Sequence, residues 1–201
     1  MNHIALATED ELSEKVGERL AQDAGLSICQ YLRRNGAGYL KSRTFNFNQM
    51  SSHLPVLLIT DLDDTVCAPS LLASWLKAQR RHVNFIFRVA EREIEAWLLA
   101  DPQAIRQLMG SRIRQIPTNP DEIPDPKQFI LNLAARAPRQ VRDELIASNA
   151  AVASQGIGYN SLLSRMVTES WSPARASEAS PSLARARQRL HELCARVDSS
   201  R

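Results

Sequence analysis

Three carboxylates stand within four positions, at Asp61, Asp63 and Asp64, directly after the apolar run 56–60. Apolar and β-branched residues in such a run predict a strand buried on both faces of a parallel sheet. If the strand continues, Asp61 and Asp63 point to the same side, about 6–7 Å apart, because side chains alternate along a strand. Carboxylates held so close repel each other unless a cation lies between them. The pattern therefore predicts a divalent-metal site, against the alternative that these residues form a turn or a helix cap.

Two further acidic groups follow other expected strands. Glu9 comes after the apolar run 4–8, and three glutamates, Glu91, Glu93 and Glu95, come after the run 83–89. The carboxyl ends of parallel strands meet at one edge of a sheet, where open α/β sheets bind their ligands. Oxygen ligands without histidine or cysteine favour Mg²⁺ or Mn²⁺ over zinc. With metal bound, such an edge can activate water and clamp a phosphodiester.

The choice among neighbouring glutamates is open at this level. At the first strand we choose Glu9 by position, since Glu11 and Glu14 fit the acidic first turn of the following helix. After the last strand we choose Glu93, with Glu95 second. On a helix beginning near residue 92, positions 91 and 95 share a face, whereas a continued strand projects 91, 93 and 95 together. A helix start capped by its own acids is the alternative.

Two lysines are candidates for stabilising charge on a phosphate. Lys41 lies in a glycine-containing segment, 33–41, that is expected to be a loop, and Lys127 follows the proline-rich segment. A compact ammonium can stabilise a developing phosphorane or a leaving oxygen. The alternative for Lys127 is an exposed position in the first turn of a helix. The expected catalytic residues are thus Glu9, Asp61, Asp63, Glu93 and Lys127, and the expected metal ligands are Glu9, Asp61, Asp63, Glu93 and Glu95.

Composition limits the class of protein. The chain has 201 residues, 44% of them hydrophobic, which suffices for a core of one domain with an appendage. Neither a membrane-spanning segment nor a signal peptide is expected, and three isolated cysteines predict a reducing cytoplasm. The net charge is only +3, but arginines accumulate towards the C-terminus. A basic tail beside an acidic pocket is compatible with a nucleic-acid substrate.

Strands and helices alternate through the first half of the chain, which predicts an α/β fold. We expect about four strands in a mainly parallel sheet flanked by helices. Prolines 117, 120, 124 and 126 then mark a linker, and the remainder is expected to be helical. The predicted organisation is an α/β core over 1–110, a Pro-rich linker over 111–126 and a helical C-terminal part over 127–201. The helices expected in that last part are 127–136, 139–148, 161–170 and 181–197.

The glutamate after the first strand and the Asp61-Leu-Asp63 triplet resemble the TOPRIM superfamily of topoisomerases, primases and OLD-type nucleases. Residues 4–100 carry this resemblance. It implies a TOPRIM-like fold in which a Glu and an Asp-x-Asp pair bind metal ions for phosphoryl transfer. The match departs from the family pattern in two places, since Asp10 replaces the usual Gly after Glu9, and Ser13 stands where OLD-type members carry a second Glu.

Segments beyond the triplet resemble a small OLD-nuclease-like bacterial branch of DUF4276-like proteins. They are 91–101, Asp125-Pro-Lys127, the Gly156-Ile-Gly-Tyr-Asn160 string and Ser180-Pro-Ser-Leu183. Members of such branches accompany ATPases in phage-defence loci, so the resemblance implies an ATPase partner and a role in anti-phage defence.

These observations lead to a Mg²⁺-dependent nuclease acting on nucleic acid, DNA rather than RNA, in the cytoplasm. One alternative is a non-catalytic or partner-activated subunit that docks on an ATPase. A weaker alternative is a phosphatase of the haloacid-dehalogenase type, because Asp61-Leu-Asp-Asp-Thr65 resembles its Asp-x-Asp-x-Thr motif. No membrane partner is expected, and association with further copies of the chain is left open.

Overall fold

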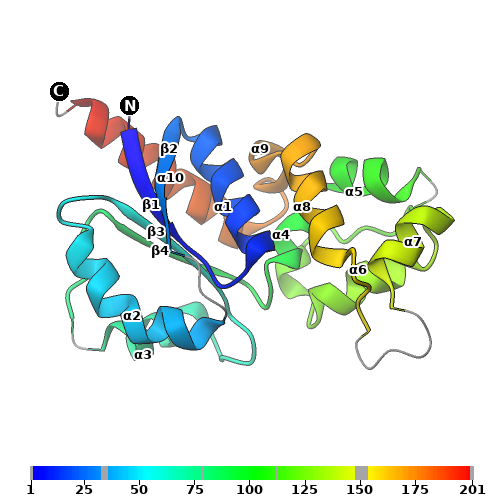
Figure 1. Ribbon diagram of the computed structural model, residues 1–201, viewed down its shortest axis with the longest axis horizontal. Helices are drawn as coiled ribbons and strands as arrows, with labels where there is room; N and C mark the ends of the chain where they lie inside the picture. The colour runs from blue at the N-terminus through cyan, green and yellow to red at the C-terminus, as the bar shows by residue number, and fades with distance from the viewer. Residues whose placement is uncertain (1, 33–35, 78, 112, 148–153, 200–201) are drawn as a thin grey trace.

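The computed structural model describes residues 2–32, 36–77, 79–111, 113–147 and 154–199 (Figure 1). Its centre is a four-stranded sheet in the order β2-β1-β3-β4, and every pair of neighbouring strands is parallel. The α/β class and the parallel sheet expected from the sequence are confirmed. The strands are β1 Asn2–Ala7, β2 Leu26–Tyr31, β3 Val56–Asp61 and β4 Phe85–Ala90.

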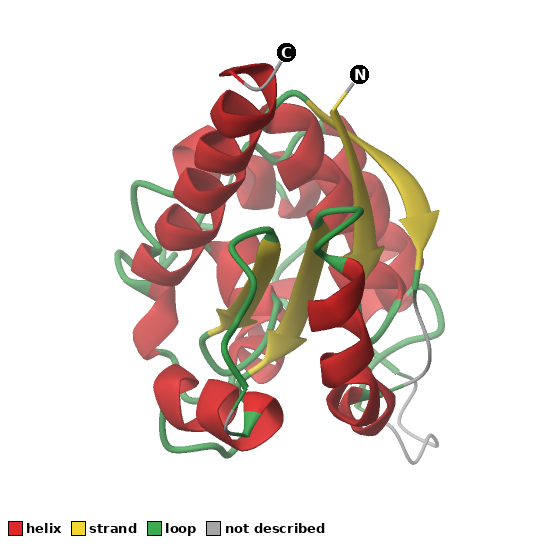
Figure 2. Ribbon diagram, turned by 90° about the vertical axis from the view of Figure 1, so that its left-hand side faces the viewer, coloured by secondary structure: helices red, strands yellow, loops and turns green. Residues whose placement is uncertain are grey.

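Helices cover both faces of this sheet. One face packs against α2 Ala37–Met50 and α3 Ala68–Leu76, and the other against α1 Glu11–Asp23 and the C-terminal helix α10 Pro181–Ser199 (Figures 1 and 2). Alternate residues of each strand enter the two cores, so that Leu57 and Ile59 face α1 while Val56 and Leu58 face α2. Because both faces are buried, β3 is a continuous apolar run.

The remaining helices extend the core on the α1 and α10 side. They are α4 Glu95–Leu99, α5 Pro102–Met109, η1 Pro120–Glu122, α6 Pro126–Ala134, α7 Arg139–Leu145, α8 Tyr159–Glu169 and α9 Pro173–Ala176. Helix α8 packs closely on α1. The buried Trp171, just after α8, contacts the buried Trp97 of α4, and its indole N–H donates to the Trp97 carbonyl at 3.0 Å. The expected helical C-terminal region is confirmed; the proposed domain boundaries stay a prediction.

Two local expectations were wrong. The segment 33–41 was expected to be a loop, but α2 begins at Ala37, after Gly36 with φ of +89°. Residues 33–35 of that segment lie outside the described residues. Helix α5 was not expected, yet the sequence carries two signals for its start. The Asp101 carboxylate caps the helix by accepting from the backbone N–H groups of Gln103 and Ala104, and Pro102 is favoured at the first helical position.

Within the described part of the chain, no helix is both long and apolar enough to cross a membrane.

Candidate functional site

The carboxyl ends of β1, β3 and β4 are neighbours in the sheet, and the acidic side chains meet there. Glu9 follows β1, Asp61 ends β3, and Glu95 begins α4 just after β4. Helix α6 brings Lys127 to the same place. The sheet order thus brings together Glu9, Asp61 and Glu95, and α6 adds Lys127, which is more than 100 positions from Glu9 in the sequence.

Glu9 is held against the end of β3. Its Oε1 accepts hydrogen bonds from the Thr60 hydroxyl and from the Asp61 backbone N–H, the latter at 3.2 Å. Burial raises the pKa of Glu9, although the two hydrogen bonds work in the opposite direction. Helix α1 starts right afterwards, capped by Asp10, so Glu11 and Glu14 stand in its acidic first turn.

Asp61 is the least satisfied carboxylate of the site. Its Oδ1 is fully enclosed and meets no hydrogen-bond donor among the described residues. Burial raises the pKa of Asp61 well above its usual value, and the negative charges of Glu95 and Glu9 raise it further. An enclosed carboxylate oxygen without a donor costs folding free energy unless a proton or a cation reaches it.

Asp63 does not sit where strand alternation would place it, and this expectation was wrong. Strand β3 ends at Asp61, and Asp63 has φ of +47° in the turn that follows. Its N–H donates to the Arg92 carbonyl at 2.9 Å while an Arg92 guanidinium N–H donates to the Asp63 carbonyl at 3.1 Å. Arg92 also has positive φ, +64°. The two segments, each with a residue in a sparsely populated backbone conformation, are therefore held together by these hydrogen bonds. Asp63 is exposed, at the rim of the carboxylate cluster.

Glu95 is almost completely buried, with 2% of its surface exposed. Its Oε1 accepts from the Tyr159 hydroxyl at 3.0 Å and lies 3.7 Å from Lys127 Nζ. Burial raises the pKa of Glu95, whereas Lys127 works against that rise. Two glycines place Tyr159: a Cβ at Gly156 would lie 2.3 Å from the Glu144 carbonyl oxygen, and one at Gly158 would lie 2.9 Å from the Glu144 Cβ.

Lys127 lies among the carboxylates. Its Nζ is 3.5 Å from Glu93 Oε1, and its backbone N–H donates to Glu93 Oε2 at 2.9 Å. Glu93 therefore also caps the first turn of α6, which Asp125 starts by accepting from the Gln128 N–H. Burial works to lower the pKa of Lys127, but Glu95, Glu93 and Asp61 outweigh it and raise the pKa. Lys127 stays an ammonium ion.

Two other candidates lie apart from this cluster. Glu91 is 3.8 Å from Arg185 of α10, and Lys41 is an exposed residue of α2. Neither arrangement considered for 91–95 was right, because the chain bends at 91–92 and the helix begins only at Glu95. The bend sends Glu91 towards α10 and lets Glu93 and Glu95 both reach Lys127.

The charges at this site favour a cation, although the carboxylates are not arranged as a complete set of metal ligands. Asp61, Glu93 and Glu95 lie around one ammonium group, and Glu9 lies next to Asp61, so carboxylates outnumber the cation. The enclosed Asp61 oxygen and this excess fit a hard divalent ion that takes oxygen ligands. Across the described ranges, however, no three His, Cys, Asp or Glu side chains stand ready to hold a metal ion. Side-chain rotation would have to complete such a site.

Sequence reasoning missed Thr60 and Tyr159, whose hydroxyls donate to Glu9 and Glu95. Thr60 looked like an ordinary strand residue. Tyr159 stands inside the Gly156–Asn160 string, whose glycines were the available signal. The Ser180–Leu183 string is structural: Asp121 accepts from the Ser180 hydroxyl at 2.6 Å and from the Ser182 N–H at 2.8 Å.

Comparisons with curated proteins and with solved structures find no match. Membership of the TOPRIM superfamily stays a prediction. One family model, described as a domain of unknown function, DUF4276, matches residues 11–191. That match covers β2, β3, β4 and nearly all the helices, together with every site residue except Glu9. It confirms the resemblance to DUF4276-like proteins, and the chain belongs to the DUF4276 family.

Proposed function

We propose that the protein is a Mg²⁺-dependent nuclease that hydrolyses phosphodiester bonds in DNA, working in the cytoplasm as part of an anti-phage defence system with an ATPase partner. The observation that carries the catalytic part is Asp61: an enclosed carboxylate oxygen without a donor, beside Glu9 and Glu95 and facing Lys127. The ATPase and the defence role rest on the sequence resemblance alone.

Asp61, Glu9 and Glu95 are the residues that would hold Mg²⁺ or Mn²⁺, with Asp63 and Glu93 at the edge. Such an ion supplies Lewis-acid stabilisation of phosphoryl oxygens and a more acidic water. Tyr159 and Thr60 orient the two glutamates by donating to them. These hydroxyls therefore act as positioning residues.

Lys127 and Asp63 contribute in different ways. The Lys127 ammonium, with its raised pKa, keeps its proton and donates a hydrogen bond to a phosphate oxygen as negative charge develops there. Asp63 is exposed at the rim, where a water molecule can reach its carboxylate, and partial desolvation together with the charge of Asp64 raises its pKa. We assign Asp63 as the general base.

The test combines metal binding and cleavage on the same samples. Wild type is compared with Asp61→Asn and with the matched control Asp143→Asn, an exposed carboxylate on α7. We expect Mg²⁺ binding by calorimetry and cleavage of DNA in wild type and control, and loss of both in Asp61→Asn. Metal-dependent cleavage that survives in purified Asp61→Asn would contradict the proposal. A phospho-aspartyl form of Asp61 would instead support the phosphatase alternative.

One observation favours a second candidate, a non-catalytic subunit on an ATPase. Lys127 already lies close to Glu93 and Glu95, and the acidic side chains of the described residues are not grouped as a ready metal site. The ATPase complex discriminates between the two. If the complex keeps all of its function with Asp61→Asn and Asp63→Asn combined, the chain serves as a scaffold; if that function is lost while the complex still assembles, the chain is catalytic.

A further inference from the structure

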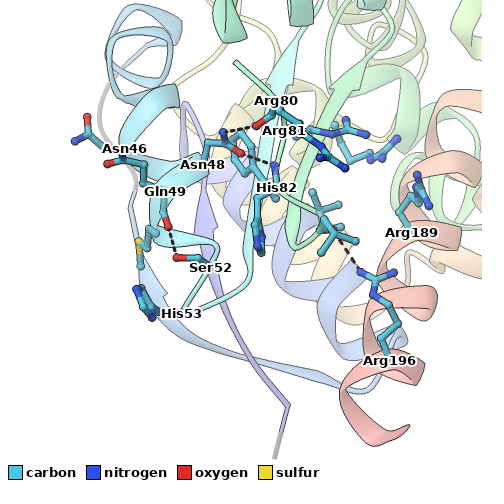
Figure 3. A pocket seen from close by; sticks show the side chains of 15 residues that line it. Asn46, Asn48, Gln49, Ser52, His53, Arg80, Arg81, His82, Arg189 and Arg196 are labelled. Atoms are coloured by element: carbon cyan, nitrogen blue, oxygen red, sulfur yellow. Dashed lines mark hydrogen bonds between the residues drawn. The ribbon is translucent and has the colours of Figure 1, made fainter. Parts of the chain in front are cut away.

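A large pocket opens beside β4, the edge strand of the sheet, near the end opposite to the carboxylates. Its volume is about 1200 Å³. Figure 3 shows its walls, which come from the end of α2, the segment before β4, β4 itself as far as Arg88, and helix α10. Its polar lining includes Asn48, Arg80, Arg81, His82, Arg88 and Arg189.

The lining of this pocket is basic. Five arginines contribute to it, Arg80, Arg81, Arg88, Arg189 and Arg196, and no Asp or Glu does so among the described residues. Glu192 lies beside the pocket and is bound at 2.6 Å to Arg189. Among the described residues, the five guanidinium groups outnumber this neighbouring carboxylate, and a positive cavity of this kind favours anions.

Arg88 shows that this charge is not only a solvated surface. Its side chain comes from β4, and its Nε is fully enclosed with no acceptor in reach among the described residues. Burial lowers the pKa of Arg88 to about 10, and the positive charges of Arg81, Arg189 and Arg185 contribute to that decrease. An enclosed guanidinium N–H without an acceptor costs free energy that a bound anion would recover.

The wall opposite α10 is preformed. Asn48 of α2 donates through its Nδ2 to the Arg80 carbonyl at 3.0 Å and accepts from the His82 N–H at 2.8 Å. The Phe85 N–H donates to the His82 carbonyl at 3.0 Å. The backbone that carries Arg80 and Arg81 is thus fastened to two elements, which reduces the ordering entropy that ligand binding would cost.

Helix α10 runs from this pocket towards the end of β4 that is nearest the carboxylate site, where it meets Glu91, outside the carboxylate cluster. Arg185 lies near Glu91, just after the end of β4, and Arg189 stands one helical turn further on, at the pocket. The five residue steps of β4 at about 3.3 Å each separate the two ends by about 17 Å. Guanidinium groups along such a path match the phosphates of an extended strand, because arginine binds phosphate bidentately.

We propose that this pocket binds the phosphate groups of a nucleic-acid strand, with Arg88 at its base and Arg189 at its rim, and that α10 leads the strand towards the carboxylates. The proposal rests on the proposed nuclease function. It goes beyond it by naming where the substrate backbone is held and which residues hold it, and these residues lie outside the catalytic cluster.

The test measures binding without cleavage. A fluorescent single-stranded DNA of about 12 nucleotides is titrated with full-length Asp61→Asn protein in EDTA, by anisotropy at several salt concentrations. We expect Arg88→Met and Arg189→Gln, each added to this background, to weaken binding about tenfold and to reduce the salt slope by about one. The control Arg165→Gln removes an exposed arginine from α8, away from the pocket, and should leave affinity unchanged.

The outcomes separate this proposal from the nuclease proposal. Equal affinity of Arg88→Met, Arg189→Gln and Arg165→Gln would overturn the phosphate pocket, whatever the cleavage assay gives. Displacement of the DNA by ATP or inorganic phosphate at micromolar concentration would also overturn it, in favour of a small-anion site. Loss of binding in both pocket variants supports the pocket even if wild type cleaves nothing. Arg189 is exposed, so its variant keeps the test valid if Arg88→Met fails to fold.

Discussion

Asp61, the half-buried last residue of β3, and Asp101, the N-cap of α5, are carboxylates in opposite environments. Asp101 is fully buried and accepts from five donors: the backbone N–H groups of Gln103, Ala104 and Ser172, and two N–H groups of Arg175, at 3.1 and 2.7 Å. Asp61 has an enclosed oxygen with no donor among the described residues, and negative neighbours.

Asp101 is a structural carboxylate, whereas the environment of Asp61 fits a carboxylate that binds a ligand. Asp101 starts α5 and ties it to α9 through Arg175, so its charge is used within the fold. The fold does not stabilise the charge of Asp61, because one of its oxygens is enclosed without a donor among the described residues and its neighbours are negative. A charged carboxylate in this environment lowers the stability of the fold. Of the three non-glycine residues with positive φ among the described residues, Asp63 and Arg92 lie close to Asp61 in the chain or through their shared hydrogen bonds, and Lys77 ends α3.

The same substitution at both positions tests this difference most directly. Asp61→Asn should lower Mg²⁺-dependent cleavage by at least about 100-fold without loss of folding. Asp101→Asn should keep the activity of each folded molecule, because Asp101 does not contact the carboxylate cluster. Cleavage rates are divided by the folded fraction from circular dichroism. Equal loss at both positions would show that the contrast has no functional meaning.

Stability should show the reverse order. Asp101→Asn weakens a buried ion pair and leaves donors poorly matched, so we expect a loss of about 3 kcal/mol in the free energy of unfolding. This is near the lower limit for buried pairs, because Arg175 is 40% exposed. Urea denaturation measures the loss. Asp143→Asn, which removes an exposed pair with Arg139, should change stability by no more than about 0.5 kcal/mol.

Tyr159→Phe tests whether Glu95 is a metal ligand, as proposed for Asp61, or a structural carboxylate like Asp101. Removing the hydroxyl takes a donor from a carboxylate that is 2% exposed, at a cost of about 1–3 kcal/mol. If Tyr159 also orients Glu95 for a metal, the apparent affinity for Mg²⁺ in the cleavage assay falls about tenfold. The control is Tyr39→Phe on α2. A loss of stability with unchanged metal dependence would make Glu95 structural, like Asp101.

The smallest expected effect is a dependence on pH. The pKa of Asp61 is raised by folding, so the native state holds a proton that the unfolded state has lost. The free energy of unfolding therefore falls as the pH rises from the unfolded pKa, near 4, through the raised native pKa. At pH 8, Asp61→Asn should melt about 2–4 °C above wild type, and the gap should close towards pH 4. An equal gap at both pH values would exclude this origin.

Periodicity and residue type were sufficient for the strands and for several helices, but not for the start of α2 or for α5. The apolar run at 56–60 became β3, and α10 spans the helix expected over 181–197. Turns were predicted poorly. The bends at Asp63 and at 91–92 depend on hydrogen bonds between two strand ends that are far apart in sequence, and no local propensity records such bonds.

Local patterns of apolar and charged residues were sufficient to predict the α/β class, the parallel strands and the identity of most acidic candidates. The environments of these acidic residues depend on the tertiary structure. Burial and neighbours distinguish the unsatisfied Asp61 from the exposed Asp63, bring Tyr159 to Glu95 and leave Arg88 enclosed in a basic pocket. The physical reason is that solvation and charge–charge energies depend on distances in space, which the sheet order sets and the sequence spacing does not.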